Sequence, residues 1–541
     1  MGSPANSATR DRHRPRRQLK FPRLGRAAAL AGVVVAVTAG CATTPAAKGA
    51  ASGSSAPATL RIATSFAVSN LDPLQNGFWG SEMGFGDLLM KPLGAGKLVP
   101  WLLKSLTRTS PDVWVLALRP GIRFQNGDQL NAGALAQTMN YMLTHNTSLE
   151  PELPGAKVTV TGPLAVTLTT RQPTASVPST LANEAYFDIF DTPVYLKLKS
   201  NPAALLGARM YTGPYTPVSL TPTQMVMVPN RYYYGPKPKL KKLTILFVSD
   251  AQARIDAVEH GQADIALYPP TAAARQLRGL TDAYFDPQQT PYVNDDFQLF
   301  FNLRSAPFDD VAVRKAVQHA INYQQIARQV MDGYYVAPDG LYPPTMPYAL
   351  HDQATDTALA RSELAADGWK QGSSGIYARN GQPLTFTVLT YPQQPDIAPI
   401  ALAMQSELRS AGISMRIRQV EDVQSVMASP SGWQAGIDGN TAMDWTDSDP
   451  IQPLIDYYTK NGGSDYGGVV NPQINRIVSQ LEASESTSQT AALLKEAQQI
   501  IIGQDAYSVI ITFKRDPVVV SAALRHYAVP HAALLWVNAY S

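Results

Sequence analysis

The stretch from residue 384 to residue 420, LTFTVLTYPQQPDIAPIALAMQSELRSAGISMRIRQV, decides the fold class. Apolar residues recur at strand spacing in Leu384–Leu389 and in Ile413–Val420, which predicts two strands. Between them, Ile397–Ser410 has apolar residues at helical spacing, and Gly412 is the expected stop of that helix. Strand, helix and strand in this order predict a β-α-β unit with a parallel pair and a right-handed crossover. We therefore expect an α/β fold.

Strand-like and helix-like segments alternate on both sides of this unit. Leu60–Ala63 alternates apolar and polar residues, and Lys157–Thr161 and Leu164–Thr170 flank a Gly-Pro pair, which predicts a hairpin. Near the end of the chain, Ser508–Phe513 again has strand character. Hairpins beside a parallel β-α-β unit predict more than one sheet, with mixed strand directions and helices packed on the sheets.

The first 57 residues differ from the rest in composition. Arg10–Arg26 holds eight basic side chains, and the uncharged stretch Ala27–Gly40 is followed by Cys41, the only cysteine of the chain. A basic segment, a short apolar segment and small residues are typical of a secretory signal peptide. The end of this leader resembles a bacterial lipobox, in which the cysteine is acylated, although Thr38 stands where a lipobox usually has Leu. We predict a signal peptide over 1–40, lipidation at Cys41 and a flexible tether over 41–57.

Arg16-Arg17-Gln18-Leu19-Lys20 partly resembles a twin-arginine export signal, and a plain basic segment is the favoured alternative. The whole chain has a formal net charge of +3, and the leader alone contributes +7. The remaining 501 residues therefore carry a net charge near −4. A mildly acidic body without basic runs argues against binding to nucleic acid. A body of this size predicts two to four domains.

Enzyme motifs are absent from the sequence. It contains no G-x-S-x-G, no G-x-x-x-x-G-K-[ST] and no H-E-x-x-H pattern. The seven histidines are scattered, and His526 and His531 lie five residues apart, which is not a helical pair of metal ligands. We therefore predict no catalytic residues, no metal site and no cofactor.

Several short motifs occur in an order that resembles one known family. Leu118–Phe124 reads LRPGIRF and Asn126–Ala132 reads NGDQLNA. Other matching pieces are Leu71-Asp72-Pro73, Leu98-Val99-Pro100, Thr212-Gly213-Pro214-Tyr215, Asn230–Gly235, Gly261–Asp264, Phe301-Asn302-Leu303 and Pro307–Val317. Together these resemble the extracellular solute-binding proteins of family 5, which serve ABC importers of oligopeptides, dipeptides, nickel and some sugars. Most of the pieces are turn and capping residues, so they identify the fold without marking a ligand site.

The resemblance implies a two-lobed fold like that of periplasmic binding proteins, with an inserted third domain. The first lobe is expected to be split over 58–100, 206–289 and 505–541. The inserted domain is expected over 101–205 and the second lobe over 292–504. The two lobes of such proteins close around their ligand by a hinge motion.

The segment AMDWTDSDP, residues 442–450, is the candidate ligand loop. Peptide-binding members of the family have an aspartate four residues before a Pro, where it pairs with the α-ammonium of the peptide. Here that position is Thr446, so Asp447 or Asp444 takes the role, or this protein does not hold a free ammonium. An exposed capped turn is the structural alternative. Asp444, Trp445 and Asp447 are the predicted contacts.

Phe78, Trp79 and Trp433 are further candidates, because aromatic side chains offer wide apolar contact to varied ligands. Ordinary core packing is the alternative for each of them. We expect a monomeric binding protein, anchored by lipid to the outer face of the cytoplasmic membrane, that captures short peptides and hands them to ABC permease subunits. A sugar or metal chelate as ligand, a surface hydrolase, or a receptor serving a sensor are the alternatives.

Overall fold

The computed structural model of the protein describes residues 58–92, 97–183, 185–287, 295–439, 449–460, 462–484 and 486–525. All of these belong to the second of two units of the chain, Ala56–Ser541. Cys41 and the rest of the predicted leader and tether lie outside the described residues. Within the described ranges, no helix is both long and apolar enough to cross a membrane.

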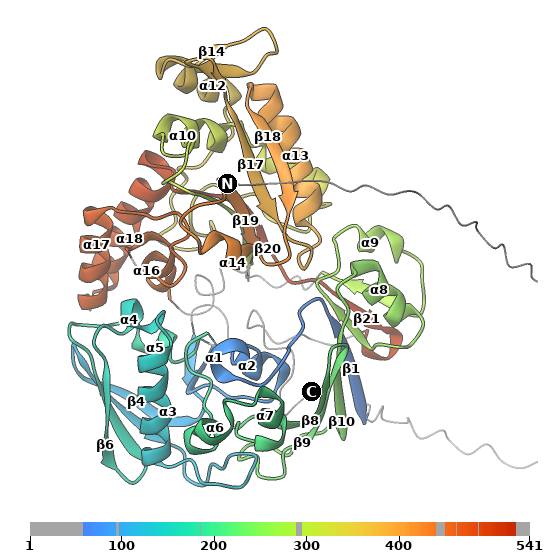
Figure 1. Ribbon diagram of the computed structural model, residues 1–541, viewed down its shortest axis with the longest axis vertical. Helices are drawn as coiled ribbons and strands as arrows, with labels where there is room; N and C mark the ends of the chain where they lie inside the picture. Colours follow the sequence, from blue (N-terminus) through green and yellow to red (C-terminus); the bar gives the residue numbers. More distant parts are fainter. Residues whose placement is uncertain are drawn as a thin grey trace, which may run out of the picture. The chain divides into compact units, whose positions relative to one another are not determined.

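The predicted β-α-β unit is present as β17 (Thr385–Thr390), α13 (Ile397–Ala411) and β18 (Ser414–Gln419). β17 and β18 are parallel, with register from Thr385↔Ser414 to Thr390↔Gln419. Gly412 ends α13 with a left-handed φ of 90°, a conformation that a residue without Cβ adopts without strain. α13 runs beside both strands (Figure 1) and buries an apolar stripe that includes Ile400 and Met404.

This unit belongs to a mixed five-stranded sheet of order β18-β17-β19-β13-β20. The other strands are β19 (Ala435–Gly439), β13 (Asp295–Phe301) and β20 (Ser508–Lys514). β13 is antiparallel to both of its neighbours, while β19 is parallel to β17. The sequence predicts a return of the chain to the first lobe at residue 505, but β20 pairs with β13 through Lys514, so the return comes after Lys514.

A seven-stranded sheet has the order β12-β21-β11-β1-β10-β9-β8. Its strands are β12 (Ala283–Asp286), β21 (Val518–Ser521), β11 (Ile265–Leu267), β1 (Thr59–Thr64), β10 (Lys242–Phe247), β9 (Gln224–Pro229) and β8 (Tyr215–Thr221). β1 is parallel to β10 and β11, and the remaining pairs are antiparallel. Segments that are far apart in sequence therefore build one sheet.

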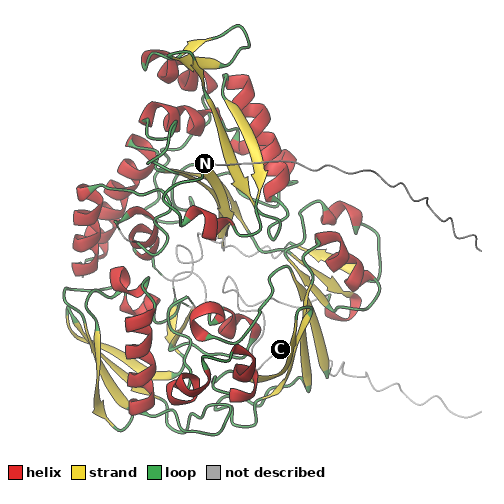
Figure 2. Ribbon diagram, in the orientation of Figure 1, coloured by secondary structure: helices red, strands yellow, loops and turns green. Residues whose placement is uncertain are grey.

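A four-stranded antiparallel sheet of order β4-β5-β7-β6 lies between β1 and β8 in the chain. Its strands are β4 (Leu103–Ser110), β5 (Val113–Leu118), β6 (Lys157–Gly162) and β7 (Ala165–Thr169), and α3 (Ala132–His145) packs against β6 and β7. Asn131 caps α3 by accepting a hydrogen bond from Ala134 N. The predicted hairpin is β6–β7. Figure 2 shows helices against the strands of each of these sheets.

The remaining elements are short or lie outside the sheets. The small strands are β2 (Met90–Pro92), β3 (Leu98–Pro100), β14 (Lys370–Gln371), β15 (Tyr377–Arg379) and β16 (Gln382–Pro383). The other α-helices are α1 (Pro73–Asn76), α2 (Trp79–Met83), α4 (Leu149–Glu152), α5 (Val177–Thr180), α6 (Thr192–Leu198), α7 (Leu205–Ala208), α8 (Ala251–Glu259), α9 (Ala273–Gln276), α10 (Val311–Ala320), α11 (Tyr323–Gln325), α12 (Thr357–Ala366), α14 (Val423–Met427), α16 (Gln452–Tyr458), α17 (Pro472–Ala483) and α18 (Thr487–Gln498). The mixed α/β architecture predicted from the sequence is confirmed.

Candidate functional site

The loops that follow the parallel strands of the two large sheets meet each other. Ser65, directly after β1, donates a hydrogen bond from its hydroxyl to the carbonyl oxygen of Gln393, after β17, at 2.9 Å. Thr271 N, after β11, donates to the carboxylate of Asp396 at 3.0 and 3.2 Å. The carboxyl ends of parallel strands are where α/β proteins usually bind ligands. This junction is therefore the candidate site.

Asp396 is buried at the centre of this junction. Besides Thr271, the Tyr335 hydroxyl donates to its Oδ2 at 2.9 Å. Burial raises the pKa of Asp396 to about 6, and the hydrogen bonds from Thr271 and Tyr335 oppose that shift. Because these hydrogen bonds stabilise the ionised form, the Asp396 carboxylate can remain buried between the two sheets.

An ion cluster lies where the chain passes between the two sheets. The cluster comprises Lys514, Asp295 and Asp516, and we call it the crossover cluster. Lys514 Nζ pairs with Asp295 and lies 2.9 Å from Asp516 Oδ1, and the side chain of Lys514 is only 2% exposed. Burial acts to lower the pKa of Lys514, but the two carboxylates outweigh it and the pKa is raised. Lys514 therefore stays charged and holds the end of β20 to the start of β13.

Four aromatic rings gather at the carboxyl ends of β1 and β11. The rings of the predicted Phe78 and Trp79 are 4.9 Å apart, and that of Phe66 lies 5.2 Å from Trp79 and 5.1 Å from Tyr268. Phe66, Phe78 and Trp79 are half-buried, so each keeps surface that a ligand can contact. Phe66 and Tyr268 were missed by the sequence analysis. The signal for Phe66 was its place three residues after the first predicted strand, Leu60–Ala63.

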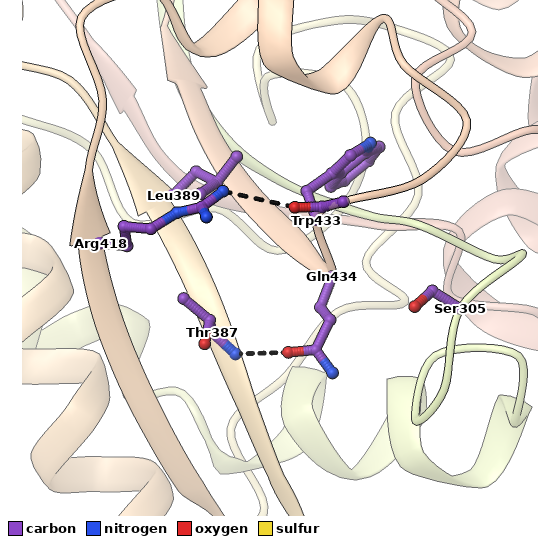
Figure 3. A pocket seen from close by; sticks show the side chains of 7 residues that line it. Ser305, Thr387, Leu389, Arg418, Trp433 and Gln434 are labelled. Atoms are coloured by element: carbon purple, nitrogen blue, oxygen red, sulfur yellow. Dashed lines mark hydrogen bonds between the residues drawn. The ribbon is translucent and has the colours of Figure 1, made fainter. Parts of the chain in front are cut away.

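Trp433 lies apart from these rings, at the amino end of β19. It is 4% exposed, and its Nε1 donates to the carbonyl oxygen of Ser429 at 2.7 Å. It lines a pocket of about 390 Å³ with Ser305, Thr387, Leu389, Arg418, Gly432 and Gln434. Gln434 accepts a hydrogen bond from Thr387 N at 2.9 Å, and its amide and the Trp433 indole point in different directions (Figure 3). This environment favours a packing role for Trp433.

Asp444, Trp445 and Asp447 lie outside the described residues, as does all of 440–448. The chain enters this segment from Gly439, whose N donates to the Tyr391 hydroxyl at 3.2 Å after the end of β17. It leaves the segment at Asp449, whose Oδ1 accepts from Ile451 N at 2.8 Å. Gly439, three residues before the predicted ligand loop, thus lies at the carboxyl end of β19, at the same edge of the sheet as Gln393.

Three acids on and beside α16 and α17 contact the four-stranded-sheet domain, and we call this the acid contact. Glu482 Oε2 accepts hydrogen bonds from Ala175 N and Ser176 N, at the start of α5. Asp449 Oδ2 accepts from the Ser179 hydroxyl at 2.6 Å. The Tyr186 hydroxyl donates to both oxygens of Asp456, at 2.9 and 3.1 Å. None of these acids forms an ion pair with a described basic residue.

The pKa values of the acid contact are shifted upward. Burial raises the pKa of Glu482 to about 7, with a further contribution from the negative charge of Asp449, and backbone hydrogen bonds oppose this. Burial likewise raises the pKa of Asp456 to about 6 and raises that of Asp449. Desolvation without a nearby cation favours the neutral form of a carboxyl group. In the part of the chain that the structure describes, no three His, Cys, Asp or Glu side chains are placed to hold a metal ion.

Residues 97–466 match the model of the bacterial extracellular solute-binding proteins, family 5. The chain belongs to this family. Among curated relatives, nickel-binding protein NikA of Staphylococcus aureus is 22% identical over 403 residues, which cover 74% of this chain and 77% of that protein. The solved NikA structure from the same organism, in complex with Ni(L-His)2, covers 89% of this chain and 98% of its own at a TM-score of 0.77 and 20% identity.

A peptide-bound structure is similar to the same extent. DppA of Helicobacter pylori, in complex with the peptide STSA, matches at a TM-score of 0.74 and 17% identity, over 88% of this chain and 96% of its own. The family 5 membership confirms the predicted two-lobed binding-protein fold. It also confirms that the protein is an extracytoplasmic solute-binding component of an ABC importer and not an enzyme.

Proposed function

We propose that this family 5 protein captures short peptides between its two lobes and delivers them to the permease of an ABC importer. The observation that carries the proposal is the aromatic group of Phe66, Phe78, Trp79 and Tyr268 beside the junction of the two sheets. Such surfaces accept peptide side chains of varied shape at low ordering cost. The similarity of the fold to a peptide-bound relative supports the same ligand class.

Asp444 or Asp447 is proposed to pair with the α-ammonium of the peptide. Both follow the carboxyl end of β19 in sequence, where the strand ends of the second sheet approach the first. Neutralising the correct acid to Asn leaves the ammonium with a neutral partner, which we expect to cost about 2–5 kcal/mol of binding free energy. Calorimetry compares Asp444→Asn and Asp447→Asn with free and N-acetylated peptides. Native affinity of both variants for free peptides would contradict this assignment.

A nickel chelate is the second candidate, because the first relatives are nickel-binding proteins. In the S. aureus structure the metal comes with L-histidine, so such a ligand brings donor atoms of its own. The lack of a three-residue metal group among the described residues therefore does not distinguish the two candidates.

Thermal-shift screening separates the candidates. A ligand at ~100 times its dissociation constant stabilises the protein by about 2.7 kcal/mol. We expect shifts with peptides of two to five residues (~0.1 to 1 mM), none with free Ni²⁺, and weak or no shifts with oligosaccharides. A shift with Ni²⁺ plus L-histidine and none with any peptide would replace the peptide assignment by the chelate.

The protein is further proposed to be anchored through acylated Cys41. In a Gram-positive host, the Cys41→Ala variant is expected in the medium, because a signal-peptide-cleaved chain without acyl groups has no membrane anchor. Metabolic labelling with a fatty-acid probe should mark the native protein and not the variant. Membrane retention of the unlabelled variant would contradict this anchor.

A further inference from the structure

Lysines are concentrated in one short segment of an otherwise slightly acidic body. Lys237, Lys239, Lys241 and Lys242 are all exposed, while Pro238 and Leu240 between them are buried. The side chains of all four lysines therefore lie at the surface, while Pro238 and Leu240 face the interior. The burial of Leu240, which is 2% exposed in the core of the seven-stranded sheet, holds the segment in place. We call these four residues the lysine segment.

Three of the four lysines in the lysine segment, Lys237, Lys241 and Lys242, carry charge that no ion pair with a described residue balances. At the same end of the sheet, the charge of Asp264 is already matched by Arg61, whose NH2 lies 2.8 Å from Asp264 Oδ1. The segment therefore presents a positive field to any surface that approaches it.

The lysine segment lies beside Ala58, the first residue that the structure describes. Lys241 N donates a hydrogen bond to the carbonyl oxygen of Ala58 at 2.7 Å, and Lys242 is the register partner of Thr59 in the parallel β1–β10 pair. Residues 42–57 separate Ala58 from Cys41. A chain of this length spans at most about 55 Å, and the flexible tether predicted from its composition would span about 22 Å on average. A lipid-anchored Cys41 would thus keep the lysine segment close to the bilayer.

We propose that Lys237, Lys241 and Lys242, with Lys239 between them, dock the anchored protein on anionic phospholipid headgroups. The proposal rests on the lipid anchor at Cys41 put forward above. Each Lys near an anionic bilayer contributes attraction that decays over about 10 Å at 0.1 M salt, so a short tether is needed to make a small number of lysines effective.

Docking at this surface orients the body on the membrane. Ala58 and the lysine segment lie at the amino end of β1, whereas Ser65, which contacts the second sheet, follows the carboxyl end. The six residues of β1 separate these ends by about 20 Å. Docked protein therefore has the junction of the two sheets directed away from the lipid, where solute arrives. Delivery to a permease then requires release of the lysine segment from the bilayer.

The test measures energy transfer from single dyes to a headgroup-labelled lipid. Acylation occupies Cys41, the only cysteine, so an introduced cysteine is the one free thiol. Thr59→Cys places a dye beside the lysine segment, and Leu402→Cys places one on α13, where Leu402 is 60% exposed. The acylated protein is reconstituted in vesicles of phosphatidylcholine alone or with phosphatidylglycerol. We expect transfer from Thr59→Cys to rise with phosphatidylglycerol and to fall again at high salt, with a smaller change at Leu402→Cys.

The matched variants decide the assignment. Lys237→Gln, Lys241→Gln and Lys242→Gln combined should abolish the gain from phosphatidylglycerol. A control triple, Lys104→Gln, Lys157→Gln and Lys370→Gln, removes the same charge from exposed sites and should retain the gain. An equal loss in both triples, or no gain in the native protein, would overturn the proposal. Failure of the protein to float with phosphatidylcholine vesicles would instead refute the lipid anchor itself.

Discussion

The crossover cluster and the acid contact both hold parts of this protein together through buried acids, but they differ in what balances the acidic charge. In the crossover cluster, Asp295 and Asp516 face the ammonium of Lys514. In the acid contact, Glu482 accepts from backbone N–H groups, and Asp456 accepts from the Tyr186 hydroxyl and interacts with the carboxyl group of Glu152. A cation keeps a buried carboxylate ionised, whereas neutral donors leave part of the desolvation cost unbalanced.

This difference predicts which of the two contacts depends on the protonation of its acids. Ser179 Oγ lies 2.6 Å from both Asp449 Oδ2 and the carbonyl oxygen of Ser176, and its single proton serves only one of them. A protonated Asp449 resolves this conflict, because it donates to Ser179 while Ser179 donates to Ser176. The raised pKa of Asp449 agrees with this arrangement. The acid contact is therefore expected to weaken as pH rises, and it joins the four-stranded-sheet domain to α16 and α17.

The largest effect is expected from removing the cation of the crossover cluster. Lys514→Met leaves the buried Asp295 and the half-buried Asp516 without their partner and should lower the free energy of unfolding by about 3–5 kcal/mol. Urea unfolding at neutral pH measures it. Adding Asp295→Asn should restore part of the loss. The control is Arg171→Met at the exposed Arg171–Glu150 pair, where the change should stay below about 1 kcal/mol. Equal losses at both sites would show that Lys514 does not balance the cluster.

The second prediction concerns the pH dependence of the acid contact. The pKa of Glu482 is raised from 4.5 to about 7 in the fold. The stability that comes from its protonated form is complete below pH 4.5 and is lost as pH rises through 7. Between pH 5 and pH 8 the loss is on the order of 2–3 kcal/mol. Glu482→Gln does not titrate, so its unfolding free energy relative to the native protein should rise over this range.

The control for this prediction is Glu421→Gln, at an exposed side chain. Its unfolding free energy relative to the native protein should be flat between pH 5 and pH 8. Hydrogen exchange of the amides of Ala175 and Ser176 gives a local readout, and their protection in the native protein should fall with pH beyond the intrinsic rate change. Identical pH curves for native protein and Glu482→Gln would contradict the proton dependence of the contact.

A smaller effect is expected at Asp456. Tyr186→Phe removes the hydroxyl that donates to both carboxylate oxygens and should cost about 1–3 kcal/mol of unfolding free energy at pH 7. The loss should shrink at pH 5, where Asp456, with a pKa of about 6, is mostly neutral. Tyr334→Phe is the control, because its hydroxyl makes no hydrogen bond with a described residue. If Tyr186→Phe loses the same unfolding free energy at both pH values, the loss comes from packing and not from the hydrogen bonds to Asp456.

The smallest effect is expected at Ser179. Ser179→Ala removes one hydroxyl that is shared between Asp449 and the Ser176 carbonyl, and about 0.5–1.5 kcal/mol should be lost. Urea unfolding of the single variant and of its combination with Glu482→Gln forms a double-mutant cycle. The two changes should be non-additive, because Asp449 and Glu482 interact through their charges. Strict additivity would mean that the acid contact is not one unit.

The sequence alone determined the fold class and the family, and the family carries the role of a solute-binding protein. The β-α-β unit over 384–420 was predictable because apolar periodicity and the Gly412 stop are local, and the family because its motifs keep their order along the chain. The half-buried Phe78 and Trp79 are candidates from the sequence because their residue type alone offers wide apolar contact. Their neighbours Phe66 and Tyr268 were missed, since nothing in the sequence states that β1 and β11 are adjacent.

Only the tertiary structure decided the rest. β20 is buried along its whole length. An apolar run of this kind does not indicate which sheet the strand joins. The sequence therefore predicts the domain boundary at 505, whereas the strand pairing puts it after Lys514. The partners of the acid contact lie about 270 to 307 residues apart in sequence. In the sequence, Glu482 looks like any other polar residue of an amphipathic helix. Its contacts at the start of α5 are visible only in the folded chain. Burial and long-range pairing, which set these charges, are properties of the folded chain and have no local sequence pattern.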